Sequence, residues 1–438
     1  MLRKVALPLL LATLLLTVTA SAAQAETLEV MLFQTGYGTD WILEAAKEYE
    51  AAHPGVKIDI TISPEIWNQL RPRFIAGNPP DLFSPGWSLD VWSLYREGQL
   101  MRLNEALETP NYAGTAPWKE DFDPLLVAAH SYQGEIYGIP YFFGMGVWAW
   151  WYDKALFEKH GWELPKTWDD LYTLNEQVRK AGLYLFALQG INPNYYTYGI
   201  YLPLVQMYGG MEAINAAFNL EPGAWKSEPF LKAAQETKRM IDAGMFLPGT
   251  LGLTHTQAQT QFFLGRTAFC ISGSWLEAEM QDIIPAGFQL RALPYPAVVG
   301  GKGDPTAVQG APDWSSNFYI PAKAKNPERA IDFLKYLTQR RIAEQLVAES
   351  GVLTAIAGAN EAVQSQALAS VVELVENAGT IWNAGELDAY YPAFTQELWN
   401  LYQALFTGEL TPEEFVERVE AEAEKVRNSG AELRYIHF

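Results

Sequence analysis

The region from residue 28 to residue 83 alternates strand-like and helix-like patterns, and this alternation constrains the fold more than any other feature. Apolar side chains recur either at every second position or at helical spacing. The expected elements are, in order, a strand over 28–33, a helix over 40–51, a strand over 56–62, a helix over 65–75 and a short strand at 82–83. Because two strands joined by a helix form a right-handed parallel crossover, the pattern predicts a doubly wound α/β architecture.

Ligands of doubly wound sheets bind beyond the carboxyl ends of the strands. Two predicted loops lie at such ends, namely 34–38 and 84–87. We therefore expect Gln34 and Tyr37 of the first loop, and Trp87 of the second, to contact a ligand.

Composition limits the class of protein. The 438 residues include 31 Lys+Arg and 51 Asp+Glu, which gives a formal net charge of −20, and 49% are hydrophobic. A chain this apolar forms a folded core, and its length predicts two or three domains. The negative charge argues against binding to nucleic acid or to anionic lipid, since phosphate groups are bound by clustered Lys and Arg.

Few residues are available for covalent or metal chemistry. The one cysteine, Cys270, excludes an intramolecular disulfide, an iron–sulfur cluster and a cysteine-based zinc site, and its apolar neighbours predict a buried side chain. No two of the five histidines have metal-ligand spacing, and the phosphate-loop, dinucleotide, zinc-protease and serine-hydrolase motifs are missing. We expect no cofactor, no metal and no catalytic residue.

The first residues have the pattern of a secretory signal peptide. Arg3 and Lys4 precede an apolar stretch over 5–18, which is too short for a membrane span, and Ala23-Gln24-Ala25 follows as a cleavage site. The mature protein should begin at Glu26. No cysteine follows the apolar stretch, so we expect an exported periplasmic protein without a lipid anchor or stable membrane insertion.

Aromatic residues, 13% of the chain, are the clearest functional signal. Trp148, Trp150 and Trp151 lie on one predicted strand, where we expect at least one face to belong to the core. Tryptophan and tyrosine in strand-end or Gly/Pro-rich loops present flat apolar faces with polar edges, which suit the C–H faces and hydroxyls of sugars. These ligand candidates are Trp87, Tyr195, Tyr198, Trp275, Trp314 and Trp382, with Asp313 as a neighbouring acceptor.

Several segments together resemble the maltose-binding-like extracellular solute-binding proteins of ABC importers. The segments, which span nearly the whole mature chain, are 78–82, 137–140, 151–161, 165–171, 265–275 and 407–414. The resemblance implies two α/β lobes joined by hinge crossings with a carbohydrate between them. After the signal peptide over 1–25, it implies a first lobe over 26–141 and 314–350, and a second lobe over 142–313 and 351–438.

The resemblance also implies roles for individual residues. Trp275, after Gly273-Ser274, is similar to the sugar-stacking tryptophan of the family. The loop after Asp81 is similar to the part of the first lobe that hydrogen-bonds sugar, which favours Trp87 and Asp81, although Asp81 has the alternative role of fixing its turn. The uncharged stretch 143–146 is two residues longer than in maltose-binding relatives, and Asp153 replaces their asparagine. These departures argue against maltose and favour another oligosaccharide.

The implied mechanism is capture without chemistry. Sugar contacts both lobes only in the closed state, so it shifts the open–closed equilibrium toward closure, and the closed monomer docks transiently on the ABC permease. Two other classes remain open. A secreted carbohydrate-active enzyme would show turnover, and a binder of polyamines or peptides would ignore sugars.

Overall fold

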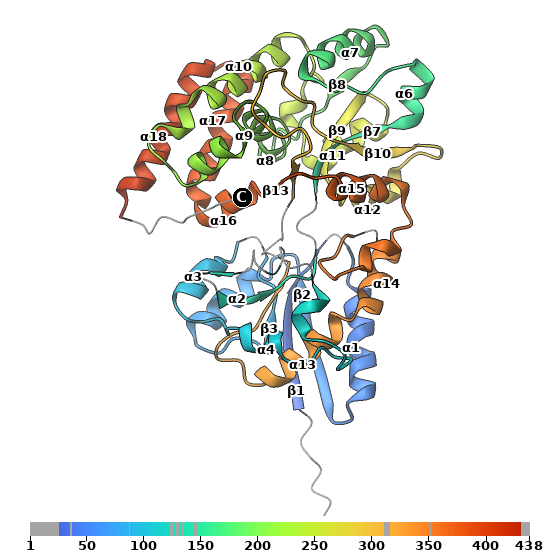
Figure 1. Ribbon diagram of the computed structural model, residues 1–438, viewed down its shortest axis with the longest axis vertical. Helices are drawn as coiled ribbons and strands as arrows, with labels where there is room; N and C mark the ends of the chain where they lie inside the picture. Colours follow the sequence, from blue (N-terminus) through green and yellow to red (C-terminus); the bar gives the residue numbers. More distant parts are fainter. Residues whose placement is uncertain are drawn as a thin grey trace, which may run out of the picture.

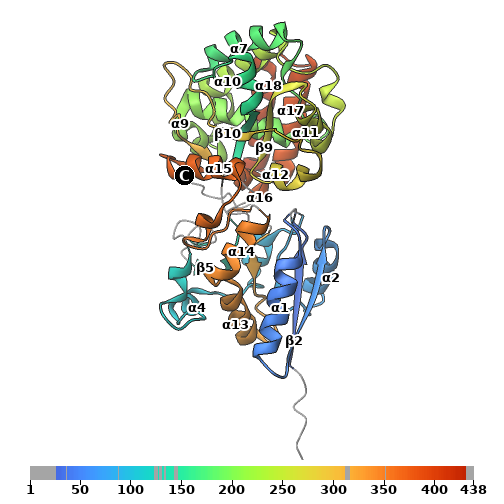
Figure 2. The same ribbon diagram turned by 90° about the vertical axis from the view of Figure 1, so that its right-hand side faces the viewer.

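A computed structural model describes residues 26–35, 37–86, 88–122, 127, 131–132, 135–142, 147–310, 316–350 and 352–430. Figure 1 shows two bodies, each built of a sheet with helices around it, and Figure 2 separates the same two bodies in the perpendicular view. We call the body that contains the N-terminal strand the first lobe and the other the second lobe. The mixed α/β class expected from the sequence is confirmed.

The first lobe contains the five-stranded sheet β2-β1-β3-β12-β6. Its elements are β1 (Glu26–Phe33), α1 (Asp40–Ala52), β2 (Val56–Ser63), α2 (Trp67–Ile75), β3 (Leu82–Phe83), α3 (Val91–Arg96), α4 (Asn104–Glu108), η1 (Trp118–Asp121), β4 (Ser131–Tyr132), β5 (Glu135–Ile136), β6 (Gly138–Ile139), β12 (Phe318–Tyr319), α13 (Pro327–Leu337), α14 (Arg340–Ser350) and η6 (Ala359–Ala362). Strand β1 pairs in parallel with both β2 and β3, as the crossover pattern predicts.

The second lobe contains the six-stranded sheet β13-β11-β7-β9-β8, with β10 also paired to β7. Its elements are β7 (Trp148–Asp153), α6 (Lys154–His160), α7 (Trp168–Lys180), β8 (Tyr184–Phe186), α8 (Asn194–Tyr196), η2 (Thr197–Tyr201), α9 (Leu202–Phe218), η3 (Ala224–Lys226), α10 (Glu228–Asp242), η4 (Thr250–Gly252), α11 (His255–Phe263), β9 (Thr267–Gly273), α12 (Leu276–Met280), η5 (Gln281–Ile283), β10 (Leu290–Leu293), β11 (Val308–Gln309), α15 (Gln366–Glu376), β13 (Ile381–Trp382), α16 (Gly385–Tyr390), α17 (Pro392–Thr407) and α18 (Pro412–Asn428).

The second-lobe sheet is buried on both faces. Trp148 and Trp150 of β7 pack in one apolar cluster, whereas Trp151, on the opposite face, packs in another. Successive side chains of a strand point to opposite faces, so these three tryptophans form core on both sides of the sheet. This confirms the expected core role. Cys270 of the neighbouring strand β9 is also buried, as predicted.

Local sequence signals set several helix starts. Thr167 accepts a hydrogen bond from the Asp170 N–H, and the Asp170 carboxylate accepts one from the Thr167 N–H, which forms a capping box at the start of α7. Helix α18 begins in the same way at Thr411 and ends among basic residues, as expected from the helix dipole. Asp153, the departure from the family pattern, caps α6 by accepting from the Ala155 N–H at 3.0 Å.

The segment from Val352 to Ile356 contacts the cores of both lobes. Its backbone pairs with the first lobe, since the Ala355 N–H donates to the Tyr141 carbonyl at 2.9 Å. Val352 and Ile356 pack in the first-lobe core, whereas Leu353 packs in a second-lobe cluster. The last change of lobe along the chain therefore follows this segment, later than residue 350.

Candidate functional site

The carboxyl ends of β1 and β3 form a pocket on the first lobe. Its lining residues come from both strand ends, α1, β2 and β12, and they are Leu32, Phe33, Thr35, Gly38, Thr39, Trp41, Ile42, Ile62, Ser84, Phe142, Ser316 and Phe318. The Ser84 hydroxyl accepts a hydrogen bond from the Phe33 N–H at 2.7 Å, which ties the two strand ends together. This is the place where the α/β architecture predicts a ligand.

The two predicted residues of the β1 loop lie beside this pocket. Gln34 is exposed, and its N–H donates to the Ser63 carbonyl at 3.0 Å, so its side chain extends from an anchored backbone. The half-buried Tyr37 ring stacks on Phe142, with ring centroids 5.6 Å apart and planes at 25°. Both side chains are therefore positioned at the strand ends, where they can contact a ligand.

Asp81 lies at the amino end of β3, away from this pocket. Its buried carboxylate accepts hydrogen bonds from the N–H of Glu29 at 3.0 Å and from the N–H of Asn326 at 2.8 Å. The Asn326 side-chain amide donates to it as well, at 3.3 Å. These bonds fix β1, β3 and the start of α13 together. The placement corrects the ligand role proposed for Asp81 and favours the alternative structural role.

Four strand ends of the second lobe meet at one edge of its sheet. Trp148, the first residue of β7, lies opposite Gly273, the last residue of β9, and opposite Gln309, the last residue of β11. Gln309 in turn lies opposite Trp382, the last residue of β13. Since β7 follows the first-lobe strand β6 along the chain, this edge is the one nearest to the first lobe (Figure 1).

An aromatic cluster covers this edge, formed by Trp148, Tyr195, Tyr198 and Trp275. The Trp148 ring makes edge-to-face contacts with the other three, with centroid distances of 5.0 Å to Tyr195, 5.7 Å to Tyr198 and 5.2 Å to Trp275. Trp148, Tyr195 and Tyr198 are buried, whereas Trp275 is partly exposed. It therefore offers the most accessible aromatic surface, as expected for the predicted stacking residue.

Gly273 holds the Trp275 ring in place. A Cβ atom at residue 273 would lie 1.9 Å from a ring carbon of Trp275, so the ring rests directly against the glycine backbone. The Gly273-Ser274-Trp275 sequence thus positions the ring through the missing side chain of its first residue.

Polar side chains support the cluster from α11 and α12. His255 stacks on Tyr195 with centroids 5.6 Å apart, and its Nε2 lies 3.1 Å from an Oε1 atom of Glu279. The Gln259 amide donates to the other oxygen of Glu279 at 2.9 Å and to the Ser272 hydroxyl at 3.2 Å. Burial raises the pKa of the Tyr195 hydroxyl, so the ring stays neutral and the cluster is free of phenolate charge at physiological pH.

The remaining predicted residues divide into two groups. Trp382 is only 2% exposed and packs in the core of the second lobe, so its ring is not an open sugar platform, contrary to the expectation from its loop-like sequence context. Trp87, Asp313 and Trp314 lie outside the described residues.

Helix α16 carries residues that the sequence analysis missed. The Tyr390 ring contacts Trp92 of the first-lobe helix α3, with centroids 4.9 Å apart, so α16 lies where the lobes meet. Burial raises the pKa of Asp388, on the same helix, to about 6. Gln309 is also new to the site: its side chain is 1% exposed, and neither amide atom has a hydrogen-bond partner among the described residues. No local sequence motif distinguishes these residues. Both α16 and β11 are short, and the contacts that place them are made with distant parts of the chain.

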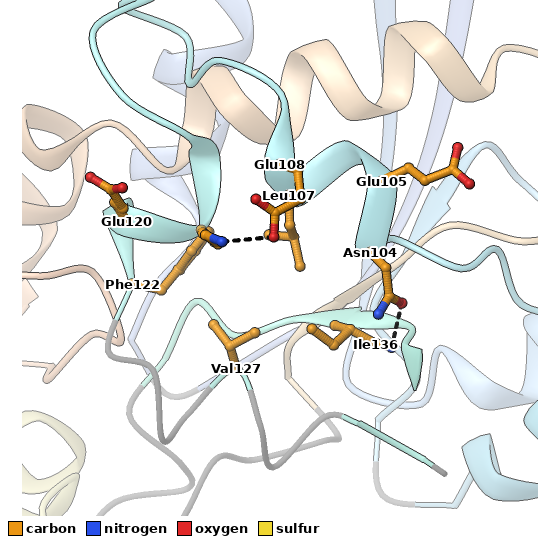
Figure 3. Close-up of a pocket in the computed structure, with 9 residues that line it drawn as sticks. Asn104, Glu105, Leu107, Glu108, Glu120, Phe122, Val127 and Ile136 are labelled. Carbon is orange, nitrogen blue, oxygen red and sulfur yellow. Dashed lines mark hydrogen bonds and ion pairs between the residues drawn. The ribbon is translucent and has the colours of Figure 1, made fainter. Parts of the chain in front are cut away.

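A separate pocket lies on the first lobe between α4, η1 and β5 (Figure 3). Its floor is apolar, with Leu107, Phe122 and Ile136, and carboxylates stand around it. One of them, Glu108, forms an ion pair of 2.7 Å with Lys119. The strand-end pocket and the aromatic cluster share no residue with it, so we treat it as separate from the ligand site.

Within the described parts of the chain, no three His, Cys, Asp or Glu side chains are grouped in a way that would hold a metal ion. The described helices include none with the length and apolar character of a membrane span.

Comparison with known proteins finds relatives along most of the chain. Residues 35–344 match the family model for bacterial extracellular solute-binding proteins. The diacetylchitobiose binding protein NgcE of Streptomyces coelicolor is 29% identical over 435 residues, covering 94% of this chain and 87% of that protein. The maltotriose-binding protein of Pyrococcus abyssi is 25% identical, covering 70% of this chain and 62% of that protein.

Solved structures share the fold. A chitin oligosaccharide binding protein superposes with a TM-score of 0.76 at 22% identity, over 92% of this chain and 100% of that chain. The raffinose complex of RafE superposes with a TM-score of 0.71 at 21% identity, over 91% of this chain and 100% of that chain. The family match extends over more than half of the sequence, and the chain therefore belongs to the bacterial extracellular solute-binding protein family.

Proposed function

We propose that this protein captures an oligosaccharide outside the cytoplasmic membrane and delivers it to an ABC permease without altering it. One observation carries the proposal. The two-lobe architecture presents an edge of aromatic rings, with Trp275 partly exposed, on the lobe opposite the strand-end pocket. The 29% identity to a diacetylchitobiose binding protein supports a β-linked amino-sugar oligosaccharide as the first ligand to test.

The mechanism follows from the two half-sites. The first lobe supplies Gln34 and Tyr37 at the ends of its strands, and the second supplies Trp275 with Tyr195 and Tyr198 behind it. A sugar that contacts both half-sites binds the closed state more tightly than the open state, and it shifts the equilibrium by that difference in affinity. The segment from Val352 to Ile356 contacts both cores and would flex as one of the crossings.

We infer that the lobes comprise residues 26–141 with 314 to about 362, and 142–313 with about 363–438. We also infer export to the periplasm after removal of residues 1–25, and a monomer that docks transiently on the permease. The predicted signal peptide lies outside the described residues. The prediction of no catalytic activity belongs to the same proposal, since a capture protein must release its ligand intact.

The test is a binding screen with product analysis. The protein from Glu26 onward is titrated calorimetrically with diacetylchitobiose, maltotriose, spermidine and a tripeptide, and each sugar is recovered and analysed by mass spectrometry. Saturable binding of an intact sugar supports the proposal. Cleaved sugar would favour a carbohydrate-active enzyme, and binding of spermidine or peptide alone would favour the other class; either result would overturn the proposal.

A further inference from the structure

Helix α16 is fixed between the two lobes. Ala384, before its first residue, and Leu387 are fully buried in the second-lobe core, and Tyr391 is 6% exposed there. Tyr390 reaches Trp92 of the first lobe. The helix is therefore held by core packing on one side and by an aromatic contact across the lobe junction on another.

Helix α16 also carries Asp388, whose carboxylate has no partner among the residues that the structure describes. Among the described residues, no hydrogen-bond donor or cation pairs with it, although burial raises its pKa to about 6. No charged group of α3 or α17, the helices that adjoin α16, contributes to that shift. A partly desolvated carboxylate without donors is costly, so its retention at a lobe junction indicates that a donor arrives from elsewhere.

The neighbourhood of Asp388 is the aromatic cluster. Helix α16 begins at Gly385, soon after Trp382 ends β13, and Trp382 lies opposite Gln309, which in turn lies opposite Trp148 of the cluster. In keeping with this position, burial first, and then the negative charge of Asp388, raise the pKa of the Tyr198 hydroxyl. Tyr198 contacts Trp148, and Trp148 contacts Trp275. The unpaired acceptor thus lies next to the rings proposed to bind the sugar.

We propose that Asp388 is a ligand-binding residue, whose carboxylate accepts a hydrogen bond from a hydroxyl or acetamido N–H of a neutral sugar held against the aromatic cluster. This inference rests on the proposed function and adds a specificity determinant to the same site. The carboxylate accepts and cannot donate when ionised, so it selects sugar groups that donate at that position. Closure of the two lobes around the sugar then surrounds the bond with protein and strengthens it.

The test compares Asp388→Asn with Asp282→Asn, since both remove one negative charge from the second lobe and Asp282 is solvent-exposed. Each variant and the wild type are titrated with diacetylchitobiose, and with maltotriose if the first sugar does not bind. We expect about ten- to one-hundred-fold weaker binding for Asp388→Asn, as for loss of a hydrogen bond to a charged group, and wild-type affinity for Asp282→Asn.

A pH series separates a ligand contact from a structural effect. If the ionised carboxylate accepts the bond, wild-type affinity falls by up to about tenfold per pH unit below pH 6, while Asp388→Asn binds equally at all these pH values. A circular-dichroism melt at each pH confirms that both proteins are folded.

The outcomes are distinct. Wild-type binding with unchanged affinity in Asp388→Asn would overturn this inference and leave the proposed function standing. Failure of the wild type to bind either sugar would overturn the proposed function and this inference with it. Tighter binding of the fully deacetylated chitobiose than of diacetylchitobiose would overturn the assignment to a neutral sugar, because it would show that the carboxylate pairs with an ammonium group.

Discussion

Replacing Gly273 with alanine tests how Trp275, the tryptophan proposed to stack on sugar, is positioned. The new Cβ would lie 1.9 Å from a ring carbon of Trp275, whereas ordinary contact begins near 3.4 Å, so the ring must withdraw by about 1.5 Å. Strand β9 is buried along its whole length and is held by β7 and β8 on either side. The half-buried Trp275 is the easier group to displace, and we expect it to turn toward solvent.

The expected loss of stability and the expected loss of sugar affinity have separate causes. Turning the ring weakens its edge contacts with Trp148 at 5.2 Å and Tyr195 at 6.3 Å, each worth about 0.5–1.5 kcal/mol, so the free energy of unfolding should fall by about 1–3 kcal/mol. Sugar affinity should fall at least about tenfold, or about 1.4 kcal/mol, if the displaced ring no longer stacks on the ligand.

Urea unfolding followed by fluorescence gives the first quantity, and calorimetric titration with the sugar that binds the wild type gives the second. Gly252→Ala is the matched control, because no heavy atom lies within 4 Å of its added Cβ. If Gly273→Ala matched this control in both stability and affinity, the argument that glycine positions the ring would be refuted.

Four further outcomes are expected. Asp81→Ala should lower the free energy of unfolding by about 2–4 kcal/mol, since buried N–H donors lose their acceptor, and should leave sugar affinity unchanged; calorimetry and urea unfolding that gave the reverse would contradict its structural role. Trp382→Ala should cost about 3–5 kcal/mol in the same unfolding assay, because its ring fills core space. Cys270, buried and with its thiol pKa raised by that burial, should react with a maleimide only after denaturation; rapid labelling of the folded protein would contradict its burial. The pKa of Asp388 is about 6 in the folded state, against the usual value of 3.8, so the free energy of unfolding of the wild type should fall as pH rises through this interval. Asp388→Asn should be about 1–3 kcal/mol more stable than the wild type at pH 7.5 and equal to it at pH 4. A pH-independent difference in unfolding free energy between the two proteins would refute the assignment.

The comparison of α2 with α16 shows what sequence patterns could predict. Helix α2 was expected over 65–75 and begins at Trp67, because apolar spacing identifies a helix more reliably than its first turn. Helix α16 spans only Gly385–Tyr390, which is too short for a periodic pattern. Its position is set by Leu387, which packs in the second-lobe core, and by Tyr390, which contacts Trp92 of the first lobe. Such contacts between distant parts of the chain leave no local signal in the sequence.

The candidate site divides in the same way. Trp275 was predicted to stack on sugar from its Gly-Ser-Trp context and from the family resemblance, and this role stays a prediction. The structure adds a steric reason for the glycine, which leaves room for the Trp275 ring. Asp81 and Trp382 could not be assigned correctly, because a strand-end or loop position does not reveal whether a side chain faces a ligand or the core. The alternation of strand and helix signals determined the parallel pairing of β1 with β2 and β3, since local periodicity and crossover handedness act within short stretches of chain. Only the tertiary structure decided which aromatic rings remain accessible and which carboxylates lack partners, because burial and pairing depend on residues brought together from up to three hundred positions away, as in the contact of Trp92 with Tyr390.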